Sequence, residues 1–74
     1  MRRLEYSMPR TFYAIVISPA ATVVHRFSTV AARTQFLAQL PPGHTAQVAS
    51  AAHPLVRKAL RYAVQLKSEW PIAV

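Results

Sequence analysis

The chain has 74 residues with a formal net charge of +7, and 53% of the residues are hydrophobic while 15% are charged. This length suits one small domain, and the composition is too apolar and too weakly charged for intrinsic disorder. Cysteine, aspartate and asparagine are absent and only two glutamates occur, so disulfides, cysteine-ligated metals, Ser-His-Asp triads and acidic magnesium sites are excluded or nearly so, and we expect no enzyme.

The first ten residues precede the periodic part of the chain and include Arg10. We expect residues 1–10 to form a flexible basic arm, either functional or simply a frayed terminus, and residues 11–74 to form a single α+β domain. The apolar run that starts at Phe12 is shorter than the core of a signal peptide, and no run approaches the roughly 20 residues of a membrane span. A cytoplasmic protein without membrane contact is therefore expected.

Two strands are predicted in the first part of this domain. Thr11–Ser18 is rich in β-branched and aromatic residues, and prolines lie near both of its ends. Both of its faces are apolar, with Phe12, Ala14 and Val16 on one and Tyr13, Ile15 and Ile17 on the other. A strand covered on one side alternates apolar and polar residues, so this strand is either central with both faces covered or lends one face to a partner. Thr22–Phe27 follows as the second strand of a hairpin.

Two helices and a weaker strand are predicted in the remainder. Ser28 or Thr29 supplies a capping hydroxyl for a helix from about residue 30 to residue 40, which a Pro-Pro-Gly run ends. Residues 45–50 form a weak third strand. Pro54 suits the first turn of a second helix that reaches about residue 68 and sets a broad apolar sector against a basic one.

The order β-β-α-β-α predicts a three-stranded sheet with both helices packed on one face, because β-α-β crossovers are right-handed. The opposite face would then expose Tyr13, Ile15 and Ile17. Exposed apolar patches of a few hundred Å² usually mark an interface, so this face predicts a homodimer or another protein partner. Trp70 near the end of the chain is expected to fold back onto the core.

Most basic residues have no acidic partner in this chain, since nine Lys and Arg face two Glu. The densest group is Arg57, Lys58 and Arg61 on the second helix. These cations either contact phosphates of a nucleic acid or form an ordinary solvated helix face, and the sequence leaves both alternatives open. Arg26 and Arg10 extend the footprint if they share its side.

Arg33 falls in the middle of the apolar sector of the first helix. There it snorkels to the edge, pairs with a glutamate or anchors an interface. His25, His44 and His53 match no spacing of metal ligands, and the lone Gly43 excludes glycine-rich phosphate loops. We therefore expect no metal and no other cofactor.

The run RFST at residues 26–29, with Arg33, Phe36 and Leu37, resembles the strand-to-helix junction of very small β-β-α-β-α proteins encoded by phages and other mobile elements. The resemblance covers about half of the chain. Some small phage proteins of this size are anti-CRISPR inhibitors, which lack catalytic sites and occupy a surface of the CRISPR effector.

This resemblance implies a non-enzymatic inhibitor of a nucleoprotein complex in a bacterial host. From the residues of this chain we expect it to act through Arg57, Lys58 and Arg61, together with Arg33 or the exposed apolar strand face. Many such inhibitors are acidic and mimic DNA, whereas a chain at +7 has to bind an acidic protein patch, guide RNA or target DNA, or to wedge an apolar face between subunits. The alternative is a module that binds nucleic acid directly, such as a small DNA- or RNA-binding regulator.

Overall fold

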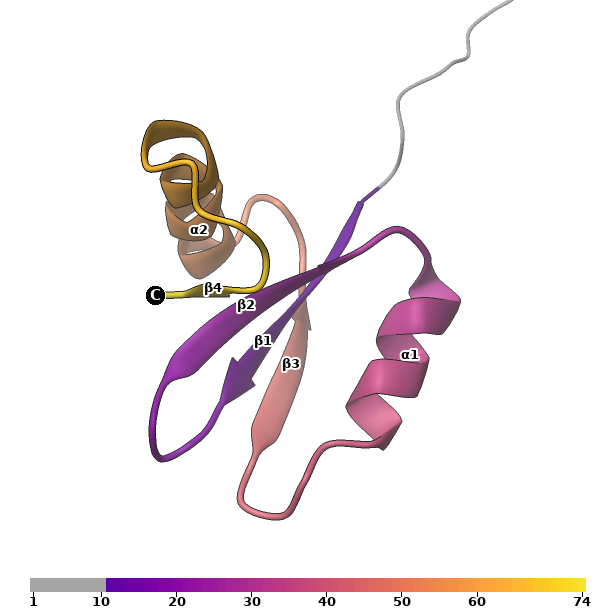
Figure 1. Ribbon diagram of the computed structural model, residues 1–74. Helices are drawn as coiled ribbons and strands as arrows, with labels where there is room; N and C mark the ends of the chain where they lie inside the picture. Colours follow the sequence, from indigo (N-terminus) through magenta and orange to yellow (C-terminus); the bar gives the residue numbers. More distant parts are fainter. Residues whose placement is uncertain (1–10) are drawn as a thin grey trace, which may run out of the picture.

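The computed structural model describes residues 11–74, so the predicted arm at residues 1–10, with Arg10, lies outside the described residues. The elements are β1 (Phe12–Ile17), β2 (Thr22–Phe27), α1 (Val30–Ala38), β3 (Thr45–Ala49), α2 (Pro54–Gln65) and β4 (Ile72–Ala73) (Figure 1). The strands form one sheet in the order β3-β1-β2-β4 with antiparallel neighbours. The predicted α+β class is confirmed.

The sheet has four strands, so the predicted three-stranded sheet is wrong. Beyond α2 the chain returns to the sheet, and Ile72 and Ala73 pair with Val24 and Val23 of β2. The element order is therefore β-β-α-β-α-β. The short fourth strand gave no pattern in the sequence, because two residues cannot show an alternation.

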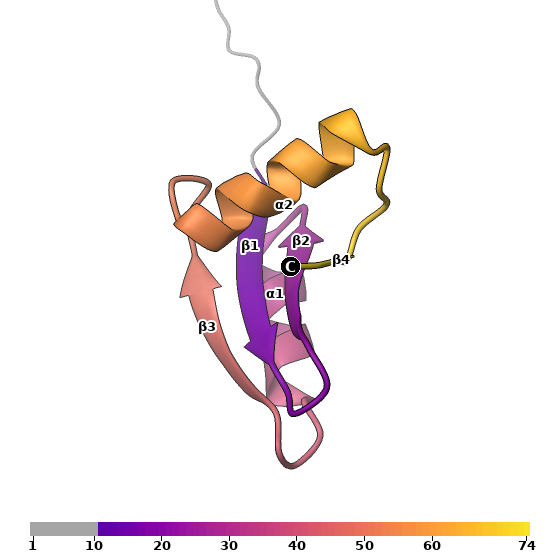
Figure 2. The same cartoon turned by 90° about the vertical axis from the view of Figure 1, so that its left-hand side faces the viewer.

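The two helices lie on opposite faces of the sheet, which corrects the prediction that both cover one face (Figures 1 and 2). The physical reason lies in β1, which occupies a central position between β3 and β2 and is apolar on both faces. One helix cannot cover both faces, so each face receives its own helix. The first of the two interpretations of the double-sided apolar strand, a central strand with both faces covered, is confirmed.

The face beneath α2 carries the main hydrophobic core. Its buried members are Tyr13, Ile15, Val24, Ala49, Val56, Ala59 and Ile72. Tyr13 and Ile15 are 5% and 0% exposed, whereas Ile17 is 45% exposed. The predicted apolar interface is therefore wrong for Tyr13 and Ile15, since the apolar sector of α2 already buries them, and only Ile17 keeps substantial contact with solvent.

The face beneath α1 is packed more loosely. No side chain of α1 is buried, although Ala14 and Val16 of β1 are buried on this side. The ring of Phe36 packs against His25 and Phe27, with ring centroids 4.5 and 5.4 Å away. This aromatic cluster attaches α1 to β2, and α1 depends on it because the helix itself is only weakly amphipathic.

Both helices begin at predicted residues. The Thr29 hydroxyl accepts a hydrogen bond from the backbone N–H of Ala32 at 3.0 Å. At α2 the Nδ1 atom of His53 accepts from the N–H of Leu55 at 3.1 Å, and Pro54 opens the helix. Each of these caps satisfies a backbone donor that a helix start leaves without an intrahelical partner. Within residues 11–74, neither helix has the length and apolar character needed to cross a bilayer.

Candidate functional site

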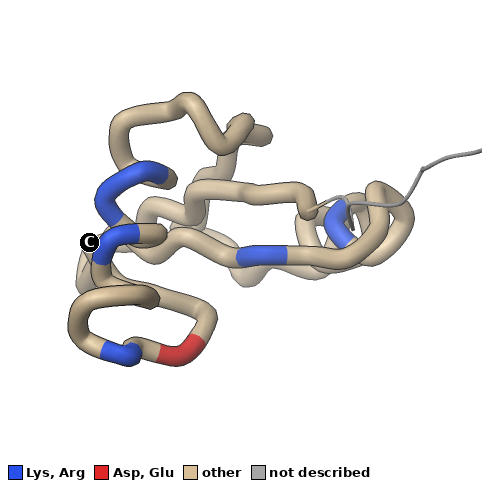
Figure 3. The backbone as a smooth tube through the Cα atoms, turned by 90° about the horizontal axis from the view of Figure 1, so that it is seen from above, with Lys and Arg blue, Asp and Glu red and all other residues tan. Residues whose placement is uncertain are grey.

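The side of α2 that faces away from the sheet is basic. Val56 and Ala59 are fully buried, so the opposite side of the helix points to solvent. Arg57 and Arg61 are exposed there and lie one helical turn apart, a spacing that places them on the same side. Figure 3 shows basic positions gathered at the α2 end of the molecule.

Two lysines complete this surface. The Nζ atom of the half-buried Lys58 lies 5.8 Å from the centroid of the Tyr62 ring, a cation–π contact. Lys67 is exposed just beyond the end of α2 and has a positive φ of 52°. We call Arg57, Lys58, Arg61 and Lys67 the basic face. The sequence analysis did not single out Lys67 and placed the end of the helix at about residue 68, whereas α2 ends at Gln65.

The basic face has one acidic residue close to it in the sequence, Glu69, two positions after Lys67. Three of the nine Lys and Arg precede residue 11, so residues 11–74 carry six of these cations against one acidic side chain, Glu69. Within the described part of the chain, the positive potential of α2 is therefore largely uncompensated. Such a surface attracts anions over about a Debye length, roughly 8 to 10 Å at physiological salt.

Arg26 lies on the same side of the sheet as α2. It pairs across β1 and β2 with Tyr13, whose side chain is buried beneath α2. The Arg26 guanidinium lies 5.1 Å from the centre of the Trp70 ring, and that ring lies 5.8 Å from the ring of Tyr13. The predicted return of Trp70 to the core is confirmed, and Arg26 can extend the basic face on this side of the molecule.

Arg33 belongs to the other side of the sheet. Its Nη1 atom donates a hydrogen bond to the carbonyl oxygen of Tyr13 at 3.3 Å, and its guanidinium lies 5.5 Å from the centre of the Phe12 ring. These contacts use the arginine to attach α1 to the first strand. Arg33 therefore packs against β1 on the α1 side of the sheet and does not join the basic face.

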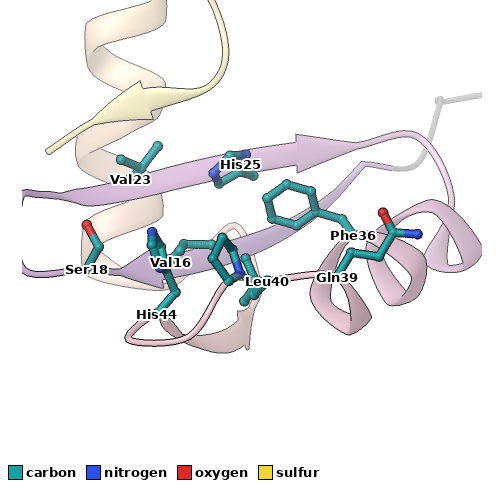
Figure 4. A pocket seen from close by; sticks show the side chains of 9 residues that line it. Val16, Ser18, Val23, His25, Phe36, Gln39, Leu40 and His44 are labelled. Carbon is teal, nitrogen blue, oxygen red and sulfur yellow. The ribbon is translucent and has the colours of Figure 1, made fainter.

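A pocket of about 340 Å³ opens between α1, the sheet and the loop before β3 (Figure 4). It is lined by Val16, Ser18, Val23, His25, Phe36, Gln39, Leu40, Pro41 and His44. Burial lowers the pKa of His25 below its usual 6.5, which keeps this ring neutral at pH 7. The lining contains no Lys, Arg, Asp or Glu and combines apolar side chains with Ser18, Gln39 and two histidines.

The histidines of residues 11–74 do not all lie together in the fold. Among residues 11–74, no three His, Cys, Asp or Glu side chains come together in a group that could hold a metal ion. His53 is occupied as the cap of α2, and its Nε2 atom lies 3.1 Å from the side-chain amide of Gln47. The Gln47 atom at this distance is the amide nitrogen, so both ring nitrogens of His53 already have a neighbour within the protein.

Comparison with protein-family models, curated proteins and solved structures gives no match for this chain. The resemblance to small phage proteins therefore stays a prediction.

Proposed function

We propose that the protein is a non-enzymatic module that binds nucleic acid directly through the basic face. The observation that carries this proposal is the presence of Arg57, Lys58 and Arg61 on α2, with Lys67 just beyond it, in a part of the chain with a single acidic side chain. Lys and Arg side chains displace counterions from phosphates, and this supplies most of the affinity of nonspecific binding. Arg26, on the same side of the sheet, adds a further cation within reach of the backbone.

The inhibitor hypothesis is less well supported than this alternative. An inhibitor acting on a host nucleoprotein complex was expected to use the basic helix face together with an exposed apolar strand face. Tyr13 and Ile15 are buried, so that second surface is largely missing from the folded chain. The basic face remains, and it suits RNA or DNA within such a complex as well as free nucleic acid. Inhibition of a CRISPR effector therefore stays a prediction that needs its own test.

The salt dependence of binding tests the proposal. Fluorescence anisotropy with a labelled DNA duplex and a labelled single-stranded RNA should give a log-log slope of about −3 to −5 on the duplex, for about four to six phosphate contacts. No binding at moderate salt, or a flat response to salt, contradicts the proposal. The nucleic acid with the lower dissociation constant at the same salt concentration is the preferred form.

A charge-matched pair of variants tests the surface. Replacing Arg57, Lys58 and Arg61 with Gln lowers the net charge from +7 by three, removes up to three phosphate contacts and should flatten the slope by roughly two to three units. The control introduces Glu at the exposed α1 positions Ala31, Thr34 and Gln35, which gives the same net charge on the other side of the sheet. Equal weakening by both variants means that only net charge matters and contradicts an assignment to α2.

Affinity capture separates the two functions. The protein is immobilised and exposed to a bacterial lysate that contains a CRISPR system, with and without nuclease. Loss of all retained material after nuclease treatment supports direct binding of nucleic acid. Retention of a defined protein complex despite nuclease favours the inhibitor and contradicts the proposal that nucleic acid is the primary ligand.

A further inference from the structure

The two edges of the sheet are built differently. At one edge β4 has two residues and follows Pro71, so it offers little backbone for pairing. At the other edge β3 has five residues and pairs only with β1 among the strands of residues 11–74. Soluble proteins usually protect such an edge with lysine, proline, a bulge or a covering segment. The β3 sequence TAQVA contains no charge and no proline, and Val48 is 59% exposed.

The region around β3 is also free of charge. No Lys, Arg, Asp or Glu occurs between Arg33 and Arg57, an interval that includes β3 and the loops on either side of it. Two copies of a chain with a net charge of +7 repel each other over most approaches. A segment without these charges is therefore where such copies can meet with the least repulsion. An acidic protein or a nucleic acid is attracted to the basic face instead. The β3 edge therefore fits a second copy of the same chain best.

We propose that β3 pairs with β3 of a second copy around a two-fold axis, which extends the sheet across both molecules. Antiparallel pairing of all five residues places Gln47 opposite its own equivalent and Ala46 opposite the partner's Val48. The exposed Val48 side chains then gain cover on the α1 side of the sheet, to which the pairing of Val48 with Ala14 assigns them. The surface is self-complementary, as an isologous dimer requires.

This arrangement has a geometric consequence for the basic face. A two-fold axis between antiparallel strands of one sheet runs perpendicular to the sheet, so both α2 helices lie on the same side of the dimer. Two basic faces then point in one direction and can contact one long polyanion with higher avidity than either alone. The pairing itself does not depend on the proposed function, since it uses a different and uncharged surface.

Sedimentation velocity of nuclease-treated protein from about 5 to about 500 µM tests the pairing, a range that reports dissociation constants in the micromolar region. We expect the mass to rise with concentration from 8.2 kDa towards twice that value. Salt should leave this association intact or strengthen it, because it screens the repulsion between the two positive copies. A monomer at every concentration in high salt overturns the proposal, whether or not the protein binds nucleic acid.

A double variant tests the surface. Ala46→Lys with Val48→Lys places lysine opposite lysine in both cross-strand pairs, which should weaken association by at least about tenfold. The control, Val64→Lys with Leu66→Lys, adds two lysines at apolar positions that are 78% and 68% exposed and should associate like the unmodified chain. Equal association of both variants overturns the assignment to β3.

A second measurement covers the case in which the β3 variant does not fold. Amide hydrogen exchange of the unmodified protein is compared at the lowest and highest concentrations. We expect backbone amides within Thr45–Ala49 to exchange more slowly at high concentration, because pairing protects those that point away from β1. Protection confined to other segments overturns the proposal even when the mass increases.

Discussion

The two faces of the sheet are formed by the same strands but are buried to different degrees by the helices that cover them. On the α2 face, a strongly amphipathic helix buries Val56 and Ala59 against Ile15 and Val24, and all four are fully buried. On the α1 face, a weakly amphipathic helix has no buried side chain and attaches to β2 mainly through the ring of Phe36. One face is a core and the other is a partly open layer with a pocket.

The difference follows from the distribution of apolar residues along each helix. The α2 sequence gathers its apolar residues on one side and its cations on the other, so burial and solvation are satisfied together. The α1 sequence contains many small residues, which cover little apolar area. We therefore expect stability to depend mainly on the α2 face, while the α1 face tolerates change.

The largest expected effect on stability comes from substitutions at two neighbouring valines of β2. Val24 is fully buried on the α2 face, whereas Val23 is half-buried beside the pocket on the α1 face. Val24→Ala should lower the free energy of unfolding by about 2 kcal/mol through lost burial and a cavity, and Val23→Ala by less than about 1 kcal/mol. Urea denaturation of both variants measures the difference. Equal losses would mean that the two faces contribute equally.

Removal of the hydroxyl that caps α1 should have a smaller effect on stability. Thr29→Ala removes the hydroxyl that accepts from the N–H of Ala32 and should cost about 1 kcal/mol. Thr29→Ser keeps the acceptor and should stay close to the unmodified protein. Chemical denaturation measures both, and hydrogen exchange should show faster opening of α1 than of α2 in the alanine variant. An alanine variant as stable as the serine variant contradicts the role of the cap.

The smallest expected effect is on how stability depends on pH. Burial lowers the pKa of His25 in the folded state below 6.5, so the unfolded chain takes up a proton first as the pH falls. The contribution of His25 to stability is complete above the unfolded pKa and is lost as the pH falls through the folded pKa. His25→Phe should flatten this part of the stability curve between about pH 7 and pH 5, as followed by thermal denaturation.

The matched control for this pH test is His44→Gln, which removes the other histidine that lines the pocket. If the slope between pH 7 and pH 5 comes from His25, the control retains it. Loss of the slope in the control alone contradicts the assignment to His25.

Local features of the fold were predictable from the residues. Thr22–Phe27 is confirmed as β2 at both ends, and Thr29 and Pro54 mark the starts of the helices as expected. These signals act over a few residues, through β-branched side chains, a capping hydroxyl and a fixed proline φ. The basic group Arg57, Lys58 and Arg61 was found in the same way, because helical periodicity alone places it opposite the apolar sector.

Placement in three dimensions was not predictable in the same way. The two-sided apolar pattern of β1 was compatible with a covered strand and with an exposed interface, and only the position of α2 shows that Tyr13 and Ile15 are buried. The sequence offered three interpretations of Arg33, and none of them named its hydrogen bond to the carbonyl oxygen of Tyr13. Side-chain partners distant in sequence leave no local signal.

The sequence by itself determined the class of the fold, the starts of both helices, both ends of β2 and the presence of a basic helix side, because periodicity, capping and charge are encoded in neighbouring residues. Only the tertiary structure decided which face of the sheet each helix covers, that the chain ends as a fourth strand beside β2, and that Arg26 and Arg33 lie on opposite sides. These outcomes depend on which apolar surfaces are buried together, a competition among all the elements of the folded chain.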